Sequence, residues 1–343
     1  MDSANILTTI NGRADPYWQQ FTEYIAPPSD GLLPWVWSLA QRARRSRAVI
    51  LRGTSGADER YRDLLAAAAI RFIAPNTQVI ISDATIAPGS RALAQRSRLL
   101  GVVAPVLARL LVRLADSGRV TWCVLSRAEV ANFPDTWGVG HGRVVFTPFA
   151  HTLWRGEARR DYPSGNHLFS GGNSLRDYDL LAAACAGIAV PVVVACSSWR
   201  PRTAPAGFDV APRTHEQFIA LLAGSRAVVL CLQPGTRSTG QQTYLNAMAL
   251  GRPVIVTDTP GVRDHIEDGV TGVVVAPTTE AVRAAVRDVL DPTRRETYQT
   301  MGARAREAVR DRFTDVSYRR RLLSLADRKH DLPALDQAVA RVT

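Results

Sequence analysis

The densest group of chemically useful side chains lies in residues 233–258. An apolar run at 227–232 precedes it, is too short for a helix and is followed by Pro234 and Gly235, so it predicts a buried strand. A polar loop then leads into a helix, which Gly251 is expected to end because glycine readily adopts the left-handed conformation of a helix C-terminus. The segment therefore predicts one strand–loop–helix–strand unit of a parallel sheet.

The start of this helix is suited to an anion, because unpaired backbone N–H groups and a partial positive charge favour phosphate there. Ser238 or Thr239 is expected to cap the helix, and Gly240 lets a ligand approach the backbone closely. Gln242 and Asn246 are four residues apart and are expected to project from one side of the helix. Either they read a ribose diol or a base edge, or they are ordinary solvated side chains.

The sequence from Asn246 to Val254, Asn-Ala-Met-Ala-Leu-Gly-Arg-Pro-Val, resembles the donor-site motif of GT-B glycosyltransferases of the retaining family 4 type, also called glycosyl transferases group 1. Residues 257–277 resemble the next loop and the closing strand of that family. The likeness covers roughly the C-terminal half of the chain. The family has two glutamates in an E-x7-E arrangement. The helix glutamate holds the nucleotide ribose, and the loop glutamate lies near the sugar. In this chain Ser238 and Asn246 stand at those two positions, and an amide binds a diol more weakly than a carboxylate does.

A second anion site is predicted where the sheet of the C-terminal half begins. A strand at 167–170 is followed by Gly171, Gly172 and Asn173, and Arg176 stands near the start of the next helix. In the resembling family, basic residues at this place hold the donor diphosphate. Arg176 is the local counterpart, and a guanidinium binds phosphate through two parallel hydrogen bonds. The alternative is a salt bridge to a neighbouring aspartate.

The resemblance implies a complete set of site residues. Arg176, Ser238 and Thr239 are expected to take part in catalysis. The donor is expected to be bound by Gly171, Gly172, Asn173, Arg176, Arg213, Thr214, Gly240, Gln241, Gln242 and Asn246. No metal ligand is predicted, and transfer is expected to proceed without metal.

The N-terminal half predicts a second parallel α/β sheet, with strands at 48–52, 78–82, 120–125 and 143–147 separated by helical stretches. Ser126 is expected to cap the helix that follows the third strand. Ligands of such sheets bind at the carboxyl ends of the strands, so acceptor-side candidates are Gly53, Ser55, Asp83 and His151. A plain turn at 53–56 and a solvated linker histidine are the alternatives.

Length and composition agree with two globular domains. A chain of 343 residues with 46% hydrophobic and 21% charged residues can bury two cores. The net charge of +11 invites a nucleic-acid or membrane interpretation. However, Lys329 is the only lysine, and an arginine bias of this kind also fits a GC-rich coding sequence. No specific nucleic-acid partner is therefore expected.

Two features favour a cytoplasmic protein. The N-terminus lacks the basic and apolar segments of a secretory signal. The four cysteines, Cys123, Cys185, Cys196 and Cys231, lie in apolar surroundings without a C-x-x-C pair, which indicates buried thiols in a reducing compartment. Residues 91–113 interleave arginines with leucines and valines. This pattern is typical either of a helix on an anionic membrane surface or of two core-facing helices that meet at Pro105.

The sequence thus predicts a GT-B protein with two Rossmann-like domains whose parallel sheets face across a cleft. Residues 1–160 are expected to form the acceptor-side domain, 161–315 the nucleotide-sugar donor domain, and 316–343 a helical tail that crosses back to the first domain. The implied activity moves a sugar from a UDP-, GDP- or TDP-linked donor to a hydroxyl or amine of a glycan, a lipid-linked or a small-molecule acceptor, with retention of configuration. No cofactor is expected, and a catalytically silent nucleotide-binding protein is the alternative.

Overall fold

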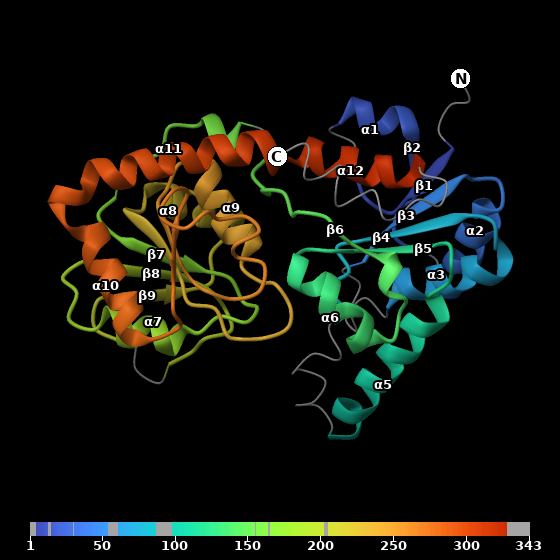
Figure 1. Ribbon diagram of the computed structural model, residues 1–343, viewed down its shortest axis with the longest axis horizontal. Coiled ribbons are helices and arrows are strands. Elements are labelled where there is room, and N and C mark those ends of the chain that lie inside the picture. The colour runs from blue at the N-terminus through green and yellow to red at the C-terminus, as the bar shows by residue number, and fades with distance from the viewer. Residues whose placement is uncertain are drawn as a thin grey trace. The chain divides into compact units, whose positions relative to one another are not determined.

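The chain divides into two compact units. Unit 1 comprises Met1–Thr147 and Tyr318–Thr343, and unit 2 comprises Pro148–Ser317. The sequence analysis draws these boundaries at residues 160 and 315. The structure, a computed structural model (Figure 1), describes residues 5–12, 15–29, 31–53, 61–86, 98–154, 156–163, 165–201 and 205–327. The candidate Ser55 and the arginines of residues 91–97 lie outside these ranges.

The sheet of unit 1 has six parallel strands in the order β2-β1-β3-β4-β5-β6. The strands are β1 (Ile6–Thr8), β2 (Thr22–Tyr24), β3 (Ala48–Arg52), β4 (Gln78–Ser82), β5 (Val120–Val124) and β6 (Val144–Phe146). The helices between them are α1 (Pro16–Phe21), α2 (Leu32–Ala43), α3 (Arg62–Ile73), α5 (Arg98–Ala115) and α6 (Arg127–Trp137). The four strands predicted for this half are confirmed, and Ser126 caps α6 by accepting a hydrogen bond from the Glu129 backbone N–H.

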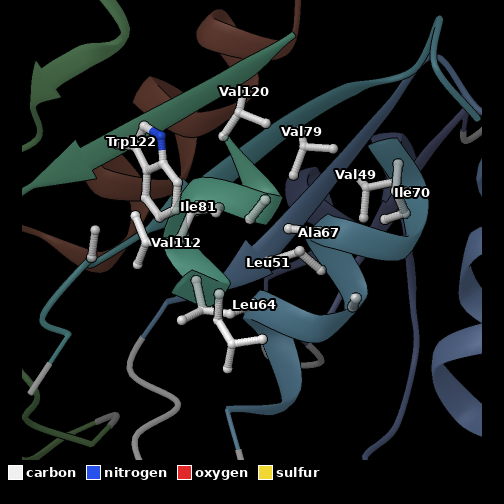
Figure 2. Close-up of a cluster of buried hydrophobic side chains, with 14 of the residues drawn as sticks. Val49, Leu51, Leu64, Ala67, Ile70, Val79, Ile81, Val112, Val120 and Trp122 are labelled. Carbon is white, nitrogen blue, oxygen red and sulfur yellow. The ribbon is translucent and has the colours of Figure 1, made fainter. Parts of the chain in front are cut away.

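The core of unit 1 lies on both faces of this sheet, because alternate residues of a strand point to opposite sides. On one face α2, α3, α5 and α6 pack against strand residues such as Val49 and Leu51 (Figure 2). The fully buried indole of Trp122 fills the end of this cluster against Phe133. On the other face, Ile50 packs against the indole of Trp18 and the leucines of α12 (Asp315–Asp327).

Helix α12 is fixed to unit 1 by polar contacts as well. The guanidinium of Arg319, which is almost fully buried, donates to the Asp15 carboxylate over 3.2 Å and lies above the ring of Trp18. Asp15 also caps α1. The last described turn of the chain therefore belongs to the core of the first unit, although it follows the whole of unit 2 in sequence.

Helix α5 is a single helix that runs through Pro105. The expectation of two helices that meet at this proline is wrong, since packing of the following turns offsets the one hydrogen bond that Pro105 cannot donate. Ala108, Leu111 and Val112 face the core. The exposed apolar residues on the other side are Val103, Val106, Leu107, Leu110 and Leu114. Among the helices in the described part of the chain, none combines the length and apolar content that crossing a membrane requires.

The sheet of unit 2 also has six parallel strands, in the order β12-β11-β10-β7-β8-β9. The strands are β7 (Leu168–Gly171), β8 (Val192–Ala195), β9 (Phe208–Ala211), β10 (Ala227–Leu230), β11 (Val254–Thr257) and β12 (Val273–Val275). The helices are α7 (Tyr178–Cys185), α8 (His215–Gly224), α9 (Gln241–Ala249), α10 (Thr279–Leu290) and α11 (Arg295–Arg312). α8, α9 and the second half of α11 cover one face, and α7 and α10 cover the other (Figure 1).

The segment at 148–162 packs largely on unit 2. Phe149, Leu153 and Tyr162 contact the apolar cluster of α8 and α9. The carboxylate of Glu157 is buried as well. The apolar residues that make these contacts are spaced irregularly between charged ones, so no periodic pattern in the sequence indicates this packing. This packing brings the segment beside the helices that start at the carboxyl edge of the sheet.

Candidate functional site

The candidate site lies at the carboxyl edge of the unit 2 sheet. There β7 ends at Gly171 and is followed by Gly172, and a side chain at either position would be too close to its neighbours. A Cβ atom at Gly171 would come within 2.6 Å of the Phe218 ring. At Gly172 the backbone has a φ of +108°, and a Cβ atom would lie 2.6 Å from the guanidinium of Arg176. Gly172 therefore leaves room for the guanidinium of Arg176, because any side chain at Gly172 would displace it.

Arg176 is held at the junction of β7 and α9. Its half-buried guanidinium donates from Nε to the Gly171 carbonyl over 3.0 Å, and from Nη1 to the Ser174 carbonyl over 2.7 Å. It also donates to the hydroxyls of Thr239, at 3.1 Å, and Thr243, at 3.3 Å. Burial lowers the pKa of Arg176, yet a guanidinium stays charged at neutral pH. The site thus contains a fixed positive charge.

The alternative role of Arg176, a salt bridge to a neighbouring aspartate, is wrong. The Asp177 side chain caps α7 by accepting from the Leu180 backbone N–H at 2.9 Å. Asp179 accepts a hydrogen bond from the Trp199 indole, also at 2.9 Å. Both carboxylates are therefore used elsewhere, and neither pairs with Arg176 among the described residues.

A second arginine, which the sequence analysis did not single out, joins Arg176 at the same turn. Arg237 is half-buried in the loop before α9 and donates to the Ser174 hydroxyl over 2.9 Å. Both guanidinium groups therefore contact Ser174. The signal was present in the sequence, since Arg237 lies inside the polar loop that precedes the helix, but nothing in that loop distinguishes it from a solvated side chain.

Helix α9 begins at Gly240, which has a φ of +89° and offers no side chain to the first turn. The expectation that Ser238 or Thr239 caps this helix is therefore wrong. Thr239 is buried and donates its hydroxyl hydrogen to the Ser174 carbonyl instead, and Ser238 is also buried. The N–H groups of the first turn consequently have no side-chain cap, as is required of an anion-binding helix start.

The three amide side chains of α9 differ in their surroundings. Gln242 is exposed, whereas Gln241 and Asn246 are buried. Within the described structure, the Gln241 side-chain nitrogen is buried and has no hydrogen-bond partner. Gln242 and Asn246, predicted to project from one side of the helix, differ in exposure because residues 149–153 cover the turn on which Asn246 lies.

Asn246 binds the backbone of the segment before β7. Its Oδ1 accepts from the Thr152 backbone N–H at 2.8 Å, and its Nδ2 donates to the Thr152 hydroxyl at 3.1 Å. The amide is thus used to fix residues 149–153 on α9. One N–H of the Asn246 amide remains beyond the bond to Thr152.

The other predicted donor residues hold loops at the same edge of the sheet. The side chain of Asn173 accepts from the backbone N–H groups of Ser197, at 2.8 Å, and Ser198, at 3.2 Å, and so joins the loops after β7 and β8. Arg213 pairs with Asp209, and Thr214 forms a capping box at the start of α8. Each of these contacts rigidifies a loop that follows a strand end.

A cluster around the buried carboxylate of Glu157, at the start of α8, was not predicted. The Glu157 carboxylate accepts from the Trp154 backbone N–H at 2.6 Å and lies 3.0 Å from His215 Nε2. The ring of His215 stacks on the Trp154 indole with centroids 4.0 Å apart. Glu157 and His215 are 58 positions apart in the sequence, so no local sequence pattern indicates their contact.

The acceptor-side candidates divide between the units. Gly53 and Asp83 follow β3 and β4 in unit 1, where the Gly53 N–H donates to the Ser82 carbonyl. Asp83 has a φ of +48°, which is unusual for a residue other than glycine. His151 belongs to unit 2, and its backbone N–H donates to the Phe313 carbonyl at 3.0 Å. Burial lowers the pKa of His151 from 6.5, and Asp315 partly opposes this effect.

The described residues contain no group of three His, Cys, Asp or Glu side chains that is arranged to hold a metal ion. All four cysteines are buried and free, as predicted. Burial raises the pKa of Cys123 to about 12 and of Cys185 to about 11. Neither thiol is therefore a nucleophile at neutral pH.

Comparison with known proteins gives a family match for part of the chain and fold matches for nearly all of it. Residues 191–292 match the family model of glycosyl transferases group 1. No curated protein matches the sequence. A glycosyltransferase from Rickettsia africae is similar in structure, with 11% identity, a TM-score of 0.59, and coverage of 94% of this chain and 89% of that one.

Two further solved structures have the same arrangement. Alr3699/HepE from Anabaena, solved in complex with UDP-glucose, has 14% identity and a TM-score of 0.61 over 93% of this chain and 90% of its own. Sucrose-phosphate synthase from Thermosynechococcus elongatus has 14% identity and a TM-score of 0.59 over 88% and 79%. The chain therefore has the GT-B fold of two Rossmann-like domains, and its residues 191–292 match glycosyl transferases group 1.

Proposed function

We propose that this protein is a glycosyltransferase that moves a sugar from a nucleotide-sugar donor to an acceptor hydroxyl or amine. The observation that carries the proposal is the convergence of Arg176, Arg237 and the uncapped start of α9 on one turn of unit 2. This arrangement offers fixed positive potential to a diphosphate. The match of residues 191–292 to glycosyl transferases group 1 supports the same activity.

In the proposed reaction, the bond between the anomeric carbon and the diphosphate oxygen breaks while the acceptor oxygen or nitrogen bonds to that carbon. Negative charge develops on the departing diphosphate, where Arg176 and Arg237 stabilise it. Because Arg176 is already held by four hydrogen bonds, little reorganisation is needed in the transition state. The acceptor proton passes to the diphosphate, so the scheme needs no separate general base. Retention of configuration and independence of metal are part of the proposal.

The donor is proposed to be a UDP-, GDP- or TDP-linked sugar bound along the loops after β7 and β8. Anabaena Alr3699/HepE has been solved with UDP-glucose and with UDP, which makes a uridine nucleotide the first to test. Gly171, Gly172 and Arg176 are assigned to the diphosphate, with Gln241 and Gln242 at the helix start. The remaining N–H of Asn246 is assigned to the ribose, and Arg213 and Thr214 to the base side.

The acceptor is proposed to be a glycan, a lipid-linked or a small molecule. Gly53, Asp83 and His151 are its candidate contacts. The exposed leucines and valines of α5, interleaved with Arg109 and Arg113, support peripheral contact with an anionic membrane. The four buried free thiols support a cytoplasmic setting.

A silent nucleotide-binding protein is the second candidate, and one observation favours it. The two positions that hold glutamates in family 4 are Ser238 and Asn246, and Asn246 is largely engaged by Thr152. Incubation with each nucleotide sugar and an acceptor library, followed by measurement of released nucleotide and of the new anomeric signal by NMR, separates the two. Transfer with a retained anomer supports the proposal, whereas tight nucleotide binding without turnover supports the silent protein.

A further inference from the structure

A pocket of about 650 Å³ lies at the amino-terminal edge of the unit 2 sheet, at the opposite ends of the strands from the candidate donor site. Its lining includes Arg226 and Pro253, which directly precede β10 and β11, and Asn166, which lies two residues before β7. Helix α11 supplies Arg295 and Tyr298 from its first turns. The volume falls within the range of about 300–1,000 Å³ that is typical of small-molecule sites.

The charged side chains that line this pocket are all arginines. Arg226, Arg252 and Arg295 line it, and no Asp or Glu is among the described residues that do so. Asp288, which accepts from the hydroxyl of Tyr298, is itself paired with Arg294. The pocket is therefore lined by cations without compensating carboxylates, which favours an anionic occupant.

Two arginines of this region are explained by the fold and require no bound ligand. Arg226 donates to the Leu290 carbonyl at the end of α10, and Arg306, which does not line the pocket, donates to the Ala249 carbonyl at the end of α9. These two arginines stabilise helix C-termini, which carry partial negative charge. Their presence is explained by the fold.

Arg252 and Arg295 are different. The Nε atom of Arg252 is buried and has no hydrogen-bond partner within the described structure. Burial and the like charge of the neighbouring Arg306 lower the pKa of Arg252. Arg295 is exposed and opens α11, a helix whose first turn has no side-chain cap. An anion placed between the two arginines would receive both guanidinium groups and the positive end of this helix.

We infer that this pocket is a second anion site of unit 2, which binds the phosphate group of a phosphorylated ligand through Arg252 and Arg295. Arginine suits phosphate because the planar guanidinium forms two parallel hydrogen bonds to it. The pocket has room for more than a single phosphate, so the natural ligand is a phosphorylated small molecule or a phosphate headgroup of a lipid. The inference goes beyond the proposed transfer activity and does not depend on it.

The test is calorimetric titration with inorganic phosphate at low salt, in the Arg176→Gln background so that the candidate donor site does not compete. The double variant Arg252→Gln/Arg295→Gln is compared with Arg304→Gln/Arg310→Gln, which removes two charges from exposed positions of the same helix α11. The pocket variant is expected to bind phosphate about tenfold more weakly or not at all, and the surface variant as the background does. The single variant Arg295→Gln, at an exposed position, guards against loss of folding.

Sedimentation with phosphatidylcholine vesicles, with and without phosphatidic acid, distinguishes the two sources of phosphate. Soluble phosphate binding alone, lost in the pocket variant, indicates a free phosphorylated ligand. Vesicle binding that requires phosphatidic acid and both arginines indicates a lipid headgroup. Equal weakening by the pocket and surface variants, or no binding of phosphate and of vesicles, overturns the inference.

Discussion

Arg176 and Arg237 are the residues on which the proposed chemistry depends, and they differ in how firmly they are held. Arg176 is tied to Gly171, Ser174, Thr239 and Thr243, so its removal also loosens the turn. Arg237 makes one bond, to the Ser174 hydroxyl, and can be removed with less damage. Substitution of Arg237 is therefore expected to affect nucleotide binding, whereas substitution of Arg176 also affects stability.

We predict that Arg237→Gln weakens nucleotide diphosphate binding about tenfold, because a hydrogen bond to a charged partner contributes about 1.5–3 kcal/mol and the neutral amide keeps part of it. Arg176→Gln is expected to weaken binding more and to lower the melting temperature as well. Calorimetric titration with the best-bound nucleotide measures the first effect, and thermal unfolding the second.

Arg304→Gln, on the exposed side of α11, is the matched control for the loss of one charge. If nucleotide affinity is unchanged in Arg176→Gln, in Arg237→Gln and in the control, the diphosphate does not bind at this turn.

His151 predicts a pH dependence of stability. Its pKa in the folded state is lowered from 6.5 by burial, so the unfolded chain takes up the proton first as the pH falls. Stability is therefore complete above the unfolded value and decreases as the pH drops below it, by at most about 1.4 kcal/mol per pH unit for one group.

His151→Gln is expected to flatten the decline of the melting temperature between about pH 6.5 and pH 5. The control is His141→Gln, because His141 is exposed and should leave the slope nearly unchanged. Parallel slopes for the wild type and His151→Gln would contradict a neutral buried imidazole.

At the residue scale, the sequence could identify groups whose role is local. Gly171, Gly172 and Arg176 lie within a few positions of each other, and their contacts follow from chain geometry. It could not identify the partner of Asn246, because Thr152 is 94 positions away, or the pair of Glu157 and His215. These contacts depend on how residues 148–162 pack, which no periodic pattern encodes.

Helix α9 is the element that joins the candidate site to the segment before β7. Its first turn faces the loop of Arg176, and its second turn holds Thr152 through Asn246. The helix is buried at eight of its positions, so it shifts little without disturbing the sheet. A change at Asn246 should therefore be felt as lost stability as well as lost nucleotide affinity.

We predict that Asn246→Ala lowers the free energy of unfolding by about 1–3 kcal/mol, since the Thr152 N–H loses its acceptor inside the protein. Urea unfolding measures this change. Asn246→Asp keeps the acceptor and should recover part of the loss. Gln242→Ala, at an exposed position of the same helix, is expected to stay within about 0.5 kcal/mol of the wild type.

If Gln242→Ala lowers the free energy of unfolding as much as Asn246→Ala does, then any truncation destabilises the helix. The hydrogen bonds between Asn246 and Thr152 would then have no special role in stability. Nucleotide affinity of Asn246→Ala is expected to fall by about 1–2 kcal/mol.

At the element scale, the buried strands were the most predictable part. β3 and β4 match the predicted ranges, because continuous apolar runs mark them. β1 and β2 were missed, since three residues give too little pattern. α9 starts at Gly240 without a side-chain cap, where a capping residue had been expected.

For the whole molecule, the alternation of strands and helices was enough to predict two parallel α/β sheets. The return of α12 to unit 1 is visible in the structure through Arg319 and the leucines that cover Ile50. The arginine excess, by contrast, has no single explanation at this scale. Several arginines close helix ends, as Arg306 does, while Arg176, Arg237 and Arg252 lie where anions are proposed to bind.

The measurement that tests the central claim most directly is a calorimetric titration of the whole protein with UDP, GDP, TDP and ADP, first without metal and then with magnesium. The proposal predicts tight binding of one nucleotide that does not require magnesium and that weakens in Arg176→Gln. Absence of binding to all four nucleotides would contradict it, because Ser238 and Asn246 would then have removed the donor site that Arg176 and the start of α9 are proposed to form.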